Sequence, residues 1–310
     1  MGQQMSVSVA SVGECMLELS GHGRNWEMGF AGDTFNTLWA MRALLPENAV
    51  TDYVSAFGDD PFSEEQRAFM EARGIGTAES PVIAGARPGL YAITLEGAER
   101  SFTYWRNDAA ARLLASDPEK LKASLSGRSL VYFSGITLAI LEPAGRQTLL
   151  DALADARKGG ALVAFDPNYR PRLWASSDTA KAAIGAALAL TDIALPTYPD
   201  EQALFGDISP AEAAKRLAGH GVGEIVVKDG AEPAYVAWKG ETGSVPAVPV
   251  AVPADTTGAG DSFNGAYLAA RLLGLTPFQA VEKAHRVAAA VVQVRGALAP
   301  FDLLRTAFAG

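Results

Sequence analysis

Cysteine and histidine are scarce in this sequence. It has one cysteine and three histidines among 310 residues. A single cysteine, Cys15, cannot form an internal disulfide, which excludes the disulfide-stapled secreted domains. The histidines His22, His220 and His285 lie far apart and fit no standard zinc spacing, so we expect them to be surface or packing residues. We also expect Cys15 to be a small core residue.

Positive charge and long apolar runs are lacking as well. The chain has 26 lysine and arginine residues against 35 aspartate and glutamate residues, a net charge of −9. This balance argues against a nucleic-acid partner, because phosphate backbones attract clustered basic residues. The longest apolar run, residues 129–141, is shorter than the ~20 residues that cross a bilayer, so no membrane partner is expected. No lysine or arginine precedes Arg24, unlike in a secretory signal, and we expect a cytoplasmic protein.

The composition that remains is that of an ordinary globular protein, with 49% apolar and 20% charged residues. Apolar strand-like runs alternate with segments of helical periodicity. Strands are expected at residues 7–12, 52–57, 130–133, 162–165, 192–195 and 224–228. Helices are expected from Gly32, from Asp60 and Pro61 to Gly74, and over residues 143–157 and 179–190. This alternation predicts an α/β fold of parallel βαβ units, with ligands at the carboxyl ends of the strands.

One segment departs from this alternation. Residues 90–95 and 100–106 are rich in β-forming side chains and flank a short turn that contains glycine. Such a pair predicts a β-hairpin. Because the alternation resumes after it, we expect the hairpin to project from the main sheet as a lid. Its exposed face predicts a homo-oligomer.

A glycine-rich loop near the C-terminus is the most informative segment for chemistry. Residues 255–265 read DTTGAGDSFNG and open a segment of helical periodicity. Free amides at such a helix start can approach a negatively charged oxygen closely. Asp261, in the first turn, could accept a proton from an attacking hydroxyl, and together these parts suit phosphoryl transfer. The loop alone fits equally well a simple bend in which Asp261 complements the helix dipole.

Other nucleotide and hydrolase motifs are missing. The sequence has no Gly-Lys pair, which excludes a Walker A loop. The candidate dinucleotide fingerprints break at the third glycine. No serine has glycine two residues before and two residues after it, which excludes the nucleophile elbow.

Residues 255–261 resemble the C-terminal signature of the ribokinase-like (PfkB) carbohydrate kinases. Residues 29–36, GFAGDTFN, resemble the glycine segment with which that family binds its sugar. Further matches, in the same order, fall at residues 13–20, 88–91, 104–107, 134–141 and 168–174. The resemblance therefore runs from the first strand to Gly296.

The resemblance implies a fold and a reaction. It implies one ribokinase-like α/β domain over residues 1–310, with a mostly parallel central sheet flanked by helices and β-lid elements near residues 14–30 and 88–107. It also implies ATP-dependent phosphorylation of the C6 hydroxyl of a sugar acid, 2-dehydro-3-deoxygluconate. Mg²⁺ would be carried by the nucleotide.

The resemblance also implies three groups of site residues. The base and the anion hole would be Asp261 with the amides of Gly258, Ala259 and Gly260. Besides Asp261, the sugar acid would contact Gly32, Asp33, Asn36, Tyr91, Tyr104, Arg106 and Arg170. Besides Gly258 and Gly260, the nucleotide would contact Asn168, Lys228 and Gly230.

The residue types agree with these roles, although each has a structural alternative. An arginine fork suits a planar carboxylate, and a tyrosine matches the apolar and polar parts of a deoxy-sugar. Alternatively, Arg106 is a charge at the hairpin edge, and Arg170 lies in a solvated loop. Tyr91 and Tyr104 could simply pack across the two strands.

The sequence also departs from the family pattern. Many members carry Asn-x-x-Glu where this chain has Thr197 and Asp200, with Glu201 beside them, so no residue is assigned to the metal. Two other functions remain open. One is a kinase of the same fold acting on fructose or another neutral keto-sugar, and the other is a sugar-acid sensor without catalysis.

Overall fold

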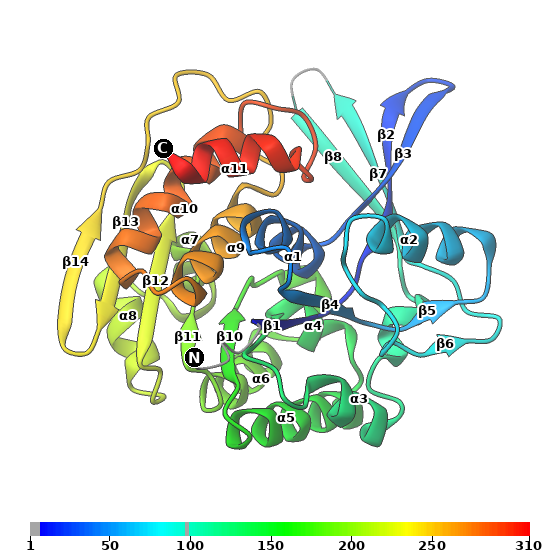
Figure 1. The fold of residues 1–310 in the computed structure, drawn as a ribbon, viewed down its shortest axis with the longest axis horizontal. Coiled ribbons are helices and arrows are strands. Elements are labelled where there is room, and N and C mark those ends of the chain that lie inside the picture. Colours follow the sequence, from blue (N-terminus) through cyan, green and yellow to red (C-terminus); the bar gives the residue numbers. More distant parts are fainter. Residues whose placement is uncertain (1–6, 97–98) are drawn as a thin grey trace.

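The computed structural model describes residues 7–96 and 99–310. Its main sheet has eight strands in the order β14-β13-β12-β11-β10-β9-β1-β4 (Figure 1). The strands are β1 (Ser8–Val12), β4 (Val50–Val54), β9 (Leu130–Ser134), β10 (Leu162–Asp166), β11 (Ile193–Ala194), β12 (Glu224–Asp229), β13 (Glu232–Trp238) and β14 (Glu241–Val245). The pairs from β4 to β12 are parallel, as the alternation predicts, whereas β13 and β14 add an antiparallel edge that was not expected.

Helices cover both faces of this sheet (Figure 1). One face carries α1 (Asp33–Leu44), α9 (Ala259–Leu272), α10 (Pro277–Val291) and α11 (Phe301–Ala309). The other carries α3 (Pro118–Leu125), α4 (Gly135–Ile140), α5 (Pro143–Lys158), α6 (Ser177–Leu188) and α8 (Pro210–Ala218). A central strand such as β9 is buried along its whole length, because helices exclude water from both of its faces.

The remaining elements connect these layers. They are α2 (Pro61–Glu71), α7 (Tyr198–Phe205), the 3₁₀ turns Ala110–Leu113 and Pro171–Leu173, and the strand pair β5 (Phe57–Gly58) and β6 (Val82–Ile83). The predicted cap of α2 is confirmed, since the Asp60 carboxylate accepts hydrogen bonds from the amides of Phe62 and Ser63. No helix in the described part of the chain is long and apolar enough to cross a membrane.

A second sheet, the lid sheet, projects beside the main one (Figure 1). Its strands β2 (Met16–His22), β3 (Asn25–Ala31), β7 (Leu90–Glu96) and β8 (Glu99–Trp105) pair in the order β3-β2-β7-β8. The predicted hairpin is confirmed as β7 and β8, although residues 97–98 of its turn lie outside the described residues. Because side chains alternate along each strand, one face of the lid sheet carries Tyr91 and Tyr104 and the other carries Leu17, Leu90 and Trp105.

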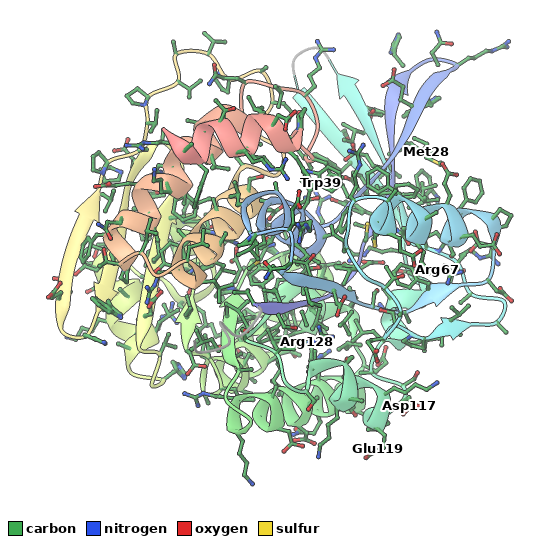
Figure 2. All side chains as sticks on the ribbon, in the orientation of Figure 1. Met28, Trp39, Arg67, Asp117, Glu119 and Arg128 are labelled. Atoms are coloured by element: carbon green, nitrogen blue, oxygen red, sulfur yellow. The ribbon has the colours of Figure 1, made fainter. Side chains whose placement is uncertain are left out.

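Helices α1 and α9 pack closely against each other. A Cβ on Gly265 of α9 would lie 2.3 Å from the backbone oxygen of Thr37 on α1, so glycine is required at this contact. Side chains fill the space between these helices and their neighbours, and Trp39 of α1 lies among them (Figure 2). The Trp39 ring stacks on Phe69 at 5.5 Å, and its indole nitrogen donates to the Ala299 carbonyl at 2.8 Å. Trp39 thereby ties α1 to α2 and to the segment before α11.

Candidate active site

The glycine-rich loop forms the start of α9, as predicted. Gly258 is the N-cap, with φ 72°, a left-handed conformation that favours glycine. A Cβ at Gly258 would also lie 2.9 Å from the backbone of Ala297. Asp255 holds the loop in place, because its carboxylate accepts hydrogen bonds from the amides of Thr257 at 2.9 Å and Gly296 at 2.8 Å.

The first amides of α9 are partly engaged. The Ala259 amide makes a long bond of 3.3 Å to the Thr256 carbonyl, and the Ser262 amide bonds the Gly258 carbonyl at 2.8 Å. Ala259, Gly260 and Asp261 make up the first turn of the helix. The positive end of the helix dipole therefore lies where the predicted anion hole needs it.

Asp261 contacts the glycine segment of residues 29–36. Its Oδ2 accepts a hydrogen bond of 2.8 Å from Nδ2 of Asn36, on α1. Burial and, next, the nearby carboxylate of Asp33 raise the pKa of Asp261 to about 7, while Asn36 and Lys228 oppose this shift. A carboxylate with a pKa near neutrality is suited to accept a proton and then release it.

Asp33 and Asn168 form a second contact at the same place. Nδ2 of Asn168 donates to Oδ2 of Asp33 at 2.8 Å, and burial raises the pKa of Asp33. Asn168 has a positive φ of 34°, and its amide bonds Oδ1 of Asp166 at 3.0 Å. The fold thus brings four predicted site residues together from three segments: Asp33, Asn36, Asn168 and Asp261.

Lys228 lies in a buried polar network that the sequence analysis did not foresee. Its Nζ is 2.8 Å from Oδ2 of Asp166 and 2.8 Å from Oδ1 of Asn264. Asn264 in turn donates to Asp166 at 2.7 Å and to the hydroxyl of Tyr132 at 3.1 Å. Each residue has a partner, so the ammonium group is held in one position. Asp166 and Asn264 both lie in segments that the motifs identified, at a strand end and in the glycine-rich loop.

A cavity of about 400 Å³ adjoins this network. Four predicted site residues line it: Lys228, Gly230, Ala259 and Gly260. The rest of its wall is mainly apolar and comes from residues 247–253 and from α9 and α10. This volume and lining are typical of a pocket for a small molecule with one apolar, ring-shaped part.

His285 of α10 also lines this cavity. It is buried and packs edge-on against Phe263 at 5.1 Å, which confirms the expected packing role. Nε2 of the imidazole is nevertheless buried without a hydrogen-bond partner, while the ring also bonds the backbone of Val245. Burial lowers the pKa of His285, so the ring is neutral and Nε2 is a free acceptor. Nothing in the sequence around His285 indicated that it lines a cavity.

Both arginines predicted to hold a carboxylate already have an acidic partner. Arg106 is paired with Glu14, whose side chain is 1% exposed. Nη1 of Arg170 lies 3.0 Å from the carboxylate of Asp200, and the Arg170 side chain is half exposed. Asp33 lies close enough to influence the charges of both Glu14 and Arg170. Each arginine is therefore held by an acidic side chain of the protein itself.

The two tyrosines of the lid sheet differ in exposure. Tyr91 is buried and Tyr104 is 47% exposed, and their rings lie 5.7 Å apart across the β7–β8 pair. The cross-strand packing weighed as an alternative is therefore present. The Tyr91 hydroxyl also donates to Glu18, and the Arg106 guanidinium lies 5.9 Å from the centre of the Tyr104 ring. Glu18 is a further polar group on this face that the sequence analysis did not single out.

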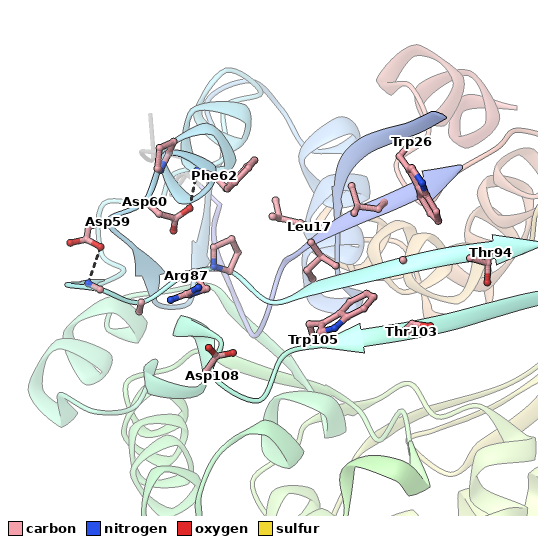
Figure 3. A pocket seen from close by; sticks show the side chains of 17 residues that line it. Leu17, Trp26, Asp59, Asp60, Phe62, Arg87, Thr94, Thr103, Trp105 and Asp108 are labelled. Atoms are coloured by element: carbon pink, nitrogen blue, oxygen red, sulfur yellow. Dashed lines mark hydrogen bonds between the residues drawn. The ribbon is translucent and has the colours of Figure 1, made fainter. Parts of the chain in front are cut away.

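The other face of the lid sheet is apolar. With the start of α2 it lines a cavity of about 1120 Å³, bordered by Leu17, Trp26, Phe62 and Trp105 (Figure 3). None of the predicted site residues lines this cavity. This larger cavity is therefore separate from the candidate active site.

The acidic residues at the start of α7 point in different directions. Glu201 is buried against Arg216, and burial raises its pKa to about 7. Asp200 faces Arg170, and Thr197 lines the 400 Å³ cavity. In the part of the chain that the structure describes, no group of three or more acidic, histidine or cysteine side chains could hold a metal alone.

This fold and site agree with the family comparison. Residues 6–303 match the model of the pfkB family of carbohydrate kinases, and the chain belongs to that family. It is 42% identical to the 2-dehydro-3-deoxygluconokinase of Dickeya dadantii, over 96% of this chain and 98% of that protein. It is 41% identical to the protein of the same name from Escherichia coli K12, over 97% and 99% of the two chains.

A solved structure shows the same fold. The putative ribokinase II of Escherichia coli, in complex with ATP and Mg²⁺, superposes with a TM-score of 0.83 over 98% of this chain and 99% of that one. The sequence identity is 23%. The expected ribokinase-like fold, with its mostly parallel sheet and its β lid, is confirmed.

Proposed function

We propose that this protein uses ATP to phosphorylate the C6 hydroxyl of 2-dehydro-3-deoxygluconate. The observation that carries the proposal is the position of Asp261. Its partly buried carboxylate lies in the first turn of α9, where the charges of Asp33 and Lys228 both influence its pKa. The relatives that match nearly the whole chain are named for this reaction.

Asp261 would act as the base. As the C6 oxygen bonds the γ-phosphorus of ATP, the hydroxyl proton passes to the Asp261 carboxylate. The bond between that phosphorus and the bridging oxygen of ADP breaks at the same time. Asn36 holds one carboxylate oxygen at 2.8 Å and so orients the other toward the substrate. The amides of Gly258, Ala259 and Gly260 would stabilise the charge on the transferred group.

The nucleotide would occupy the 400 Å³ cavity. Its apolar wall suits a purine ring, and the unpartnered Nε2 of His285 can accept a hydrogen bond from an amino group. Lys228 and Gly230 lie at the same cavity, where Lys228 supplies positive charge toward the phosphates. Asn168, which is hydrogen-bonded to Asp33, would lie beside the phosphates.

Mg²⁺ would be held mainly by the phosphates of ATP, as is usual for this ion. The residues nearby fit such a metal, because Thr197 and Asp200 offer the oxygen ligands that Mg²⁺ and its waters prefer. When bound, the ion neutralises charge that develops on the phosphates. Thr197 and Asp200 would then position the metal, a role that was left unassigned from the sequence.

The sugar acid would lie between the lid sheet and the start of α9. Arg106 and Arg170 would bind its carboxylate, and Tyr104 would cover the sugar chain from the lid. Gly32 would lie against the sugar chain. The fold itself also requires glycine at this position, since a Cβ there would lie 2.1 Å from the carbonyl oxygen of Glu14. Tyr91 would support Tyr104 from the neighbouring strand.

Two further expectations concern the protein in the cell. We propose a homo-oligomer whose contact surface is the apolar face of the lid sheet, where Trp105 is 57% exposed. We also propose that the reaction takes place in the cytoplasm, where ATP is made.

A substrate panel tests the proposed function. The protein is incubated with ATP, Mg²⁺ and either 2-dehydro-3-deoxygluconate, its galactonate analogue, fructose or ribose, and ADP release is followed. We expect kcat/KM to be highest for the sugar acids. Turnover only of fructose would identify a neutral keto-sugar kinase instead, and turnover of ribose alone would contradict both hypotheses. Binding of the sugar acid without ADP release would identify a sensor.

A variant sharpens the test. Arg106→Ala should lower kcat/KM for the sugar acid while trace activity on neutral sugars survives. Arg157→Ala, at a surface ion pair with Asp192, is the matched control and should change neither. Equal losses on acidic and neutral sugars in Arg106→Ala would contradict the carboxylate-binding role.

A further inference from the structure

Glu14 is a buried carboxylate with no role in the proposed reaction. It follows β1 at the carboxyl end of the main sheet, and its side chain is 1% exposed. Burying a carboxylate is costly unless a partner compensates its charge. The partner is Arg106, which lies just beyond the end of β8 in the lid. The ion pair therefore joins the main sheet to the lid hairpin.

The ion pair engages only some of the hydrogen-bonding atoms of Glu14 and Arg106. Nη2 of Arg106 donates to Oε2 of Glu14. Oε1 of Glu14 and Nε of Arg106 are both buried without a hydrogen-bond partner. A guanidinium group has five N–H donors in a planar fork, so one contact to Glu14 leaves others for a second carboxylate. The Arg106 side chain is 10% exposed, and the group is thus held but still accessible.

The charges around Glu14 connect it to the active site. The groups that influence it are Arg106, Asp33 and Arg112, and burial raises its pKa against the effect of Arg106. Among the acidic residues, Asp33 also has the largest effect on the pKa of Asp261. The backbone of Glu14 also touches the residue before Asp33, since a Cβ on Gly32 would lie 2.1 Å from the Glu14 carbonyl oxygen. Glu14 therefore ties Arg106 to the segment that carries Asp33.

The backbone of the lid is shaped around this pair. A Cβ on Gly89 would lie 2.6 Å from Oε1 of Glu14 and 3.2 Å from Cβ of Arg106. The Gly89 carbonyl also accepts the Leu17 amide at 2.8 Å, which starts the pairing of β7 with β2. Only a residue without a side chain can begin the lid strand directly over both groups.

We propose that Glu14 is a positioning residue that fixes the Arg106 guanidinium for the substrate carboxylate, and so sets the preference for sugar acids over neutral sugars. This inference rests on the proposed function. Without Glu14, the long Arg106 side chain samples several rotamers and must lose that freedom on binding. With Glu14, the guanidinium is already in place when the sugar acid arrives.

The charge and the hydrogen bond of Glu14 have separable effects. Glu14→Ala removes both, so we expect KM for the sugar acid to rise about 10-fold or more, with kcat within about threefold, because the lost contact is not at the reacting atoms. Glu14→Gln keeps an oxygen that accepts from Arg106. We therefore expect the ratio of kcat/KM for the sugar acid to kcat/KM for fructose in Glu14→Gln to lie within about threefold of that of the wild-type protein. A purely structural role of Glu14 does not predict this rescue.

A double-mutant cycle with Arg106→Ala tests whether Glu14 acts through Arg106. The four proteins are compared for kcat and KM on 2-dehydro-3-deoxygluconate, fructose and ATP. We expect Glu14→Ala to raise the sugar-acid KM strongly when Arg106 is present and by less than about twofold when it is absent. Equal effects in both backgrounds, or an equal loss on fructose, would overturn the inference.

Two outcomes keep this test separate from that of the proposed function. If Arg106→Ala leaves the sugar-acid preference intact, the proposed carboxylate site is wrong. If Arg106→Ala abolishes the preference and Glu14→Ala does not alter it, only the role of Glu14 is wrong. Should Glu14→Ala not fold, Gly89→Ala displaces the pair without removing a charge. It should raise KM for the sugar acid more than for fructose, and an equal rise on both would contradict the role of Glu14.

Discussion

Replacing Asp261 by asparagine removes the proposed base and almost nothing else. An asparagine at this position can still offer an oxygen to Nδ2 of Asn36, which now bonds Oδ2 of Asp261 at 2.8 Å. The side chain keeps its size, so the first turn of α9 is retained. A general base contributes about 10²–10⁴ in rate, and we expect kcat to fall by that factor. Binding of the sugar acid should persist.

The raised pKa of Asp261 gives this prediction a pH dependence. With a pKa of about 7, the carboxylate is mostly protonated at pH 5 and cannot accept a proton. We expect kcat/KM for the sugar acid to fall about tenfold for each pH unit below 7 and to reach a plateau above it. Burial is the main cause of the shift, so the profile also reports whether this carboxylate is shielded from water.

The same pKa predicts that the asparagine variant is the more stable protein at alkaline pH. Between pH 4 and 7 the folded chain keeps a proton on Asp261 that the unfolded chain has lost, so this group's contribution to stability decreases as the pH rises through that window. A shift from 3.8 to about 7, at 1.36 kcal/mol per unit, makes this cost ~4 kcal/mol above pH 7. Asp261→Asn avoids the cost, and its Tm should exceed that of the unmodified protein at pH 8 but not at pH 4.

Three measurements check the reasoning. ADP release gives kcat, calorimetry gives the affinity for the sugar acid, and thermal unfolding at pH 4 and pH 8 gives the change in stability. Asp302→Asn, whose side chain is 98% exposed on α11, is the matched control and should behave like the unmodified protein. A kcat within threefold of normal in Asp261→Asn would refute its role as the base. An unchanged Tm at pH 8 would contradict the raised pKa of Asp261 in the folded protein.

Three further predictions concern packing, the nucleotide and the metal. Gly265→Ala should destabilise the protein by about 1–3 kcal/mol in urea unfolding, because the new Cβ would meet the Thr37 carbonyl at 2.3 Å; no change would mean that α1 and α9 can separate. His285→Ala should raise KM for ATP but not for the sugar acid, while His285→Gln, which keeps an acceptor, should raise it less. Chelation of divalent ions should stop ADP release, and added Mg²⁺ should restore it; full activity in excess chelator would contradict the metal requirement.

The sequence predicted the elements whose causes are local. The apolar runs at residues 130–133 and 162–165 became β9 and β10, because strands with helices on both faces are apolar throughout. The first strand, the cap at Asp60 and the β7–β8 hairpin were found from side-chain types a few residues apart. The position of Asp261 in the first turn of α9 was likewise predicted from the residues next to it in sequence.

The apolar pattern did not predict the partly exposed strands of either sheet. Strand β3 is exposed over its first four residues, so it lacks the apolar character of a buried strand. The apolar pattern therefore predicted no strand at residues 18–26, although they form most of β2 and the start of β3. Only the family resemblance indicated lid elements in this region. Strand β13 and the edge strand β14 are also only partly buried. A polar edge strand and a loop have similar compositions, and only pairing with a neighbour distinguishes them.

By itself, then, the sequence determined the layered α/β fold, the lid hairpin and the place of Asp261 at a helix start, since these depend on neighbours along the chain. Tertiary structure alone decided the partners of the charged groups. Asn36 meets Asp261 across 225 residues, Glu14 meets Arg106 across 92, and Asp166 meets Lys228 across 62. A pKa depends on burial and on every nearby charge, whichever segment supplies it. The acidity of Asp261 and the orientation of Arg106 are therefore properties of the folded molecule.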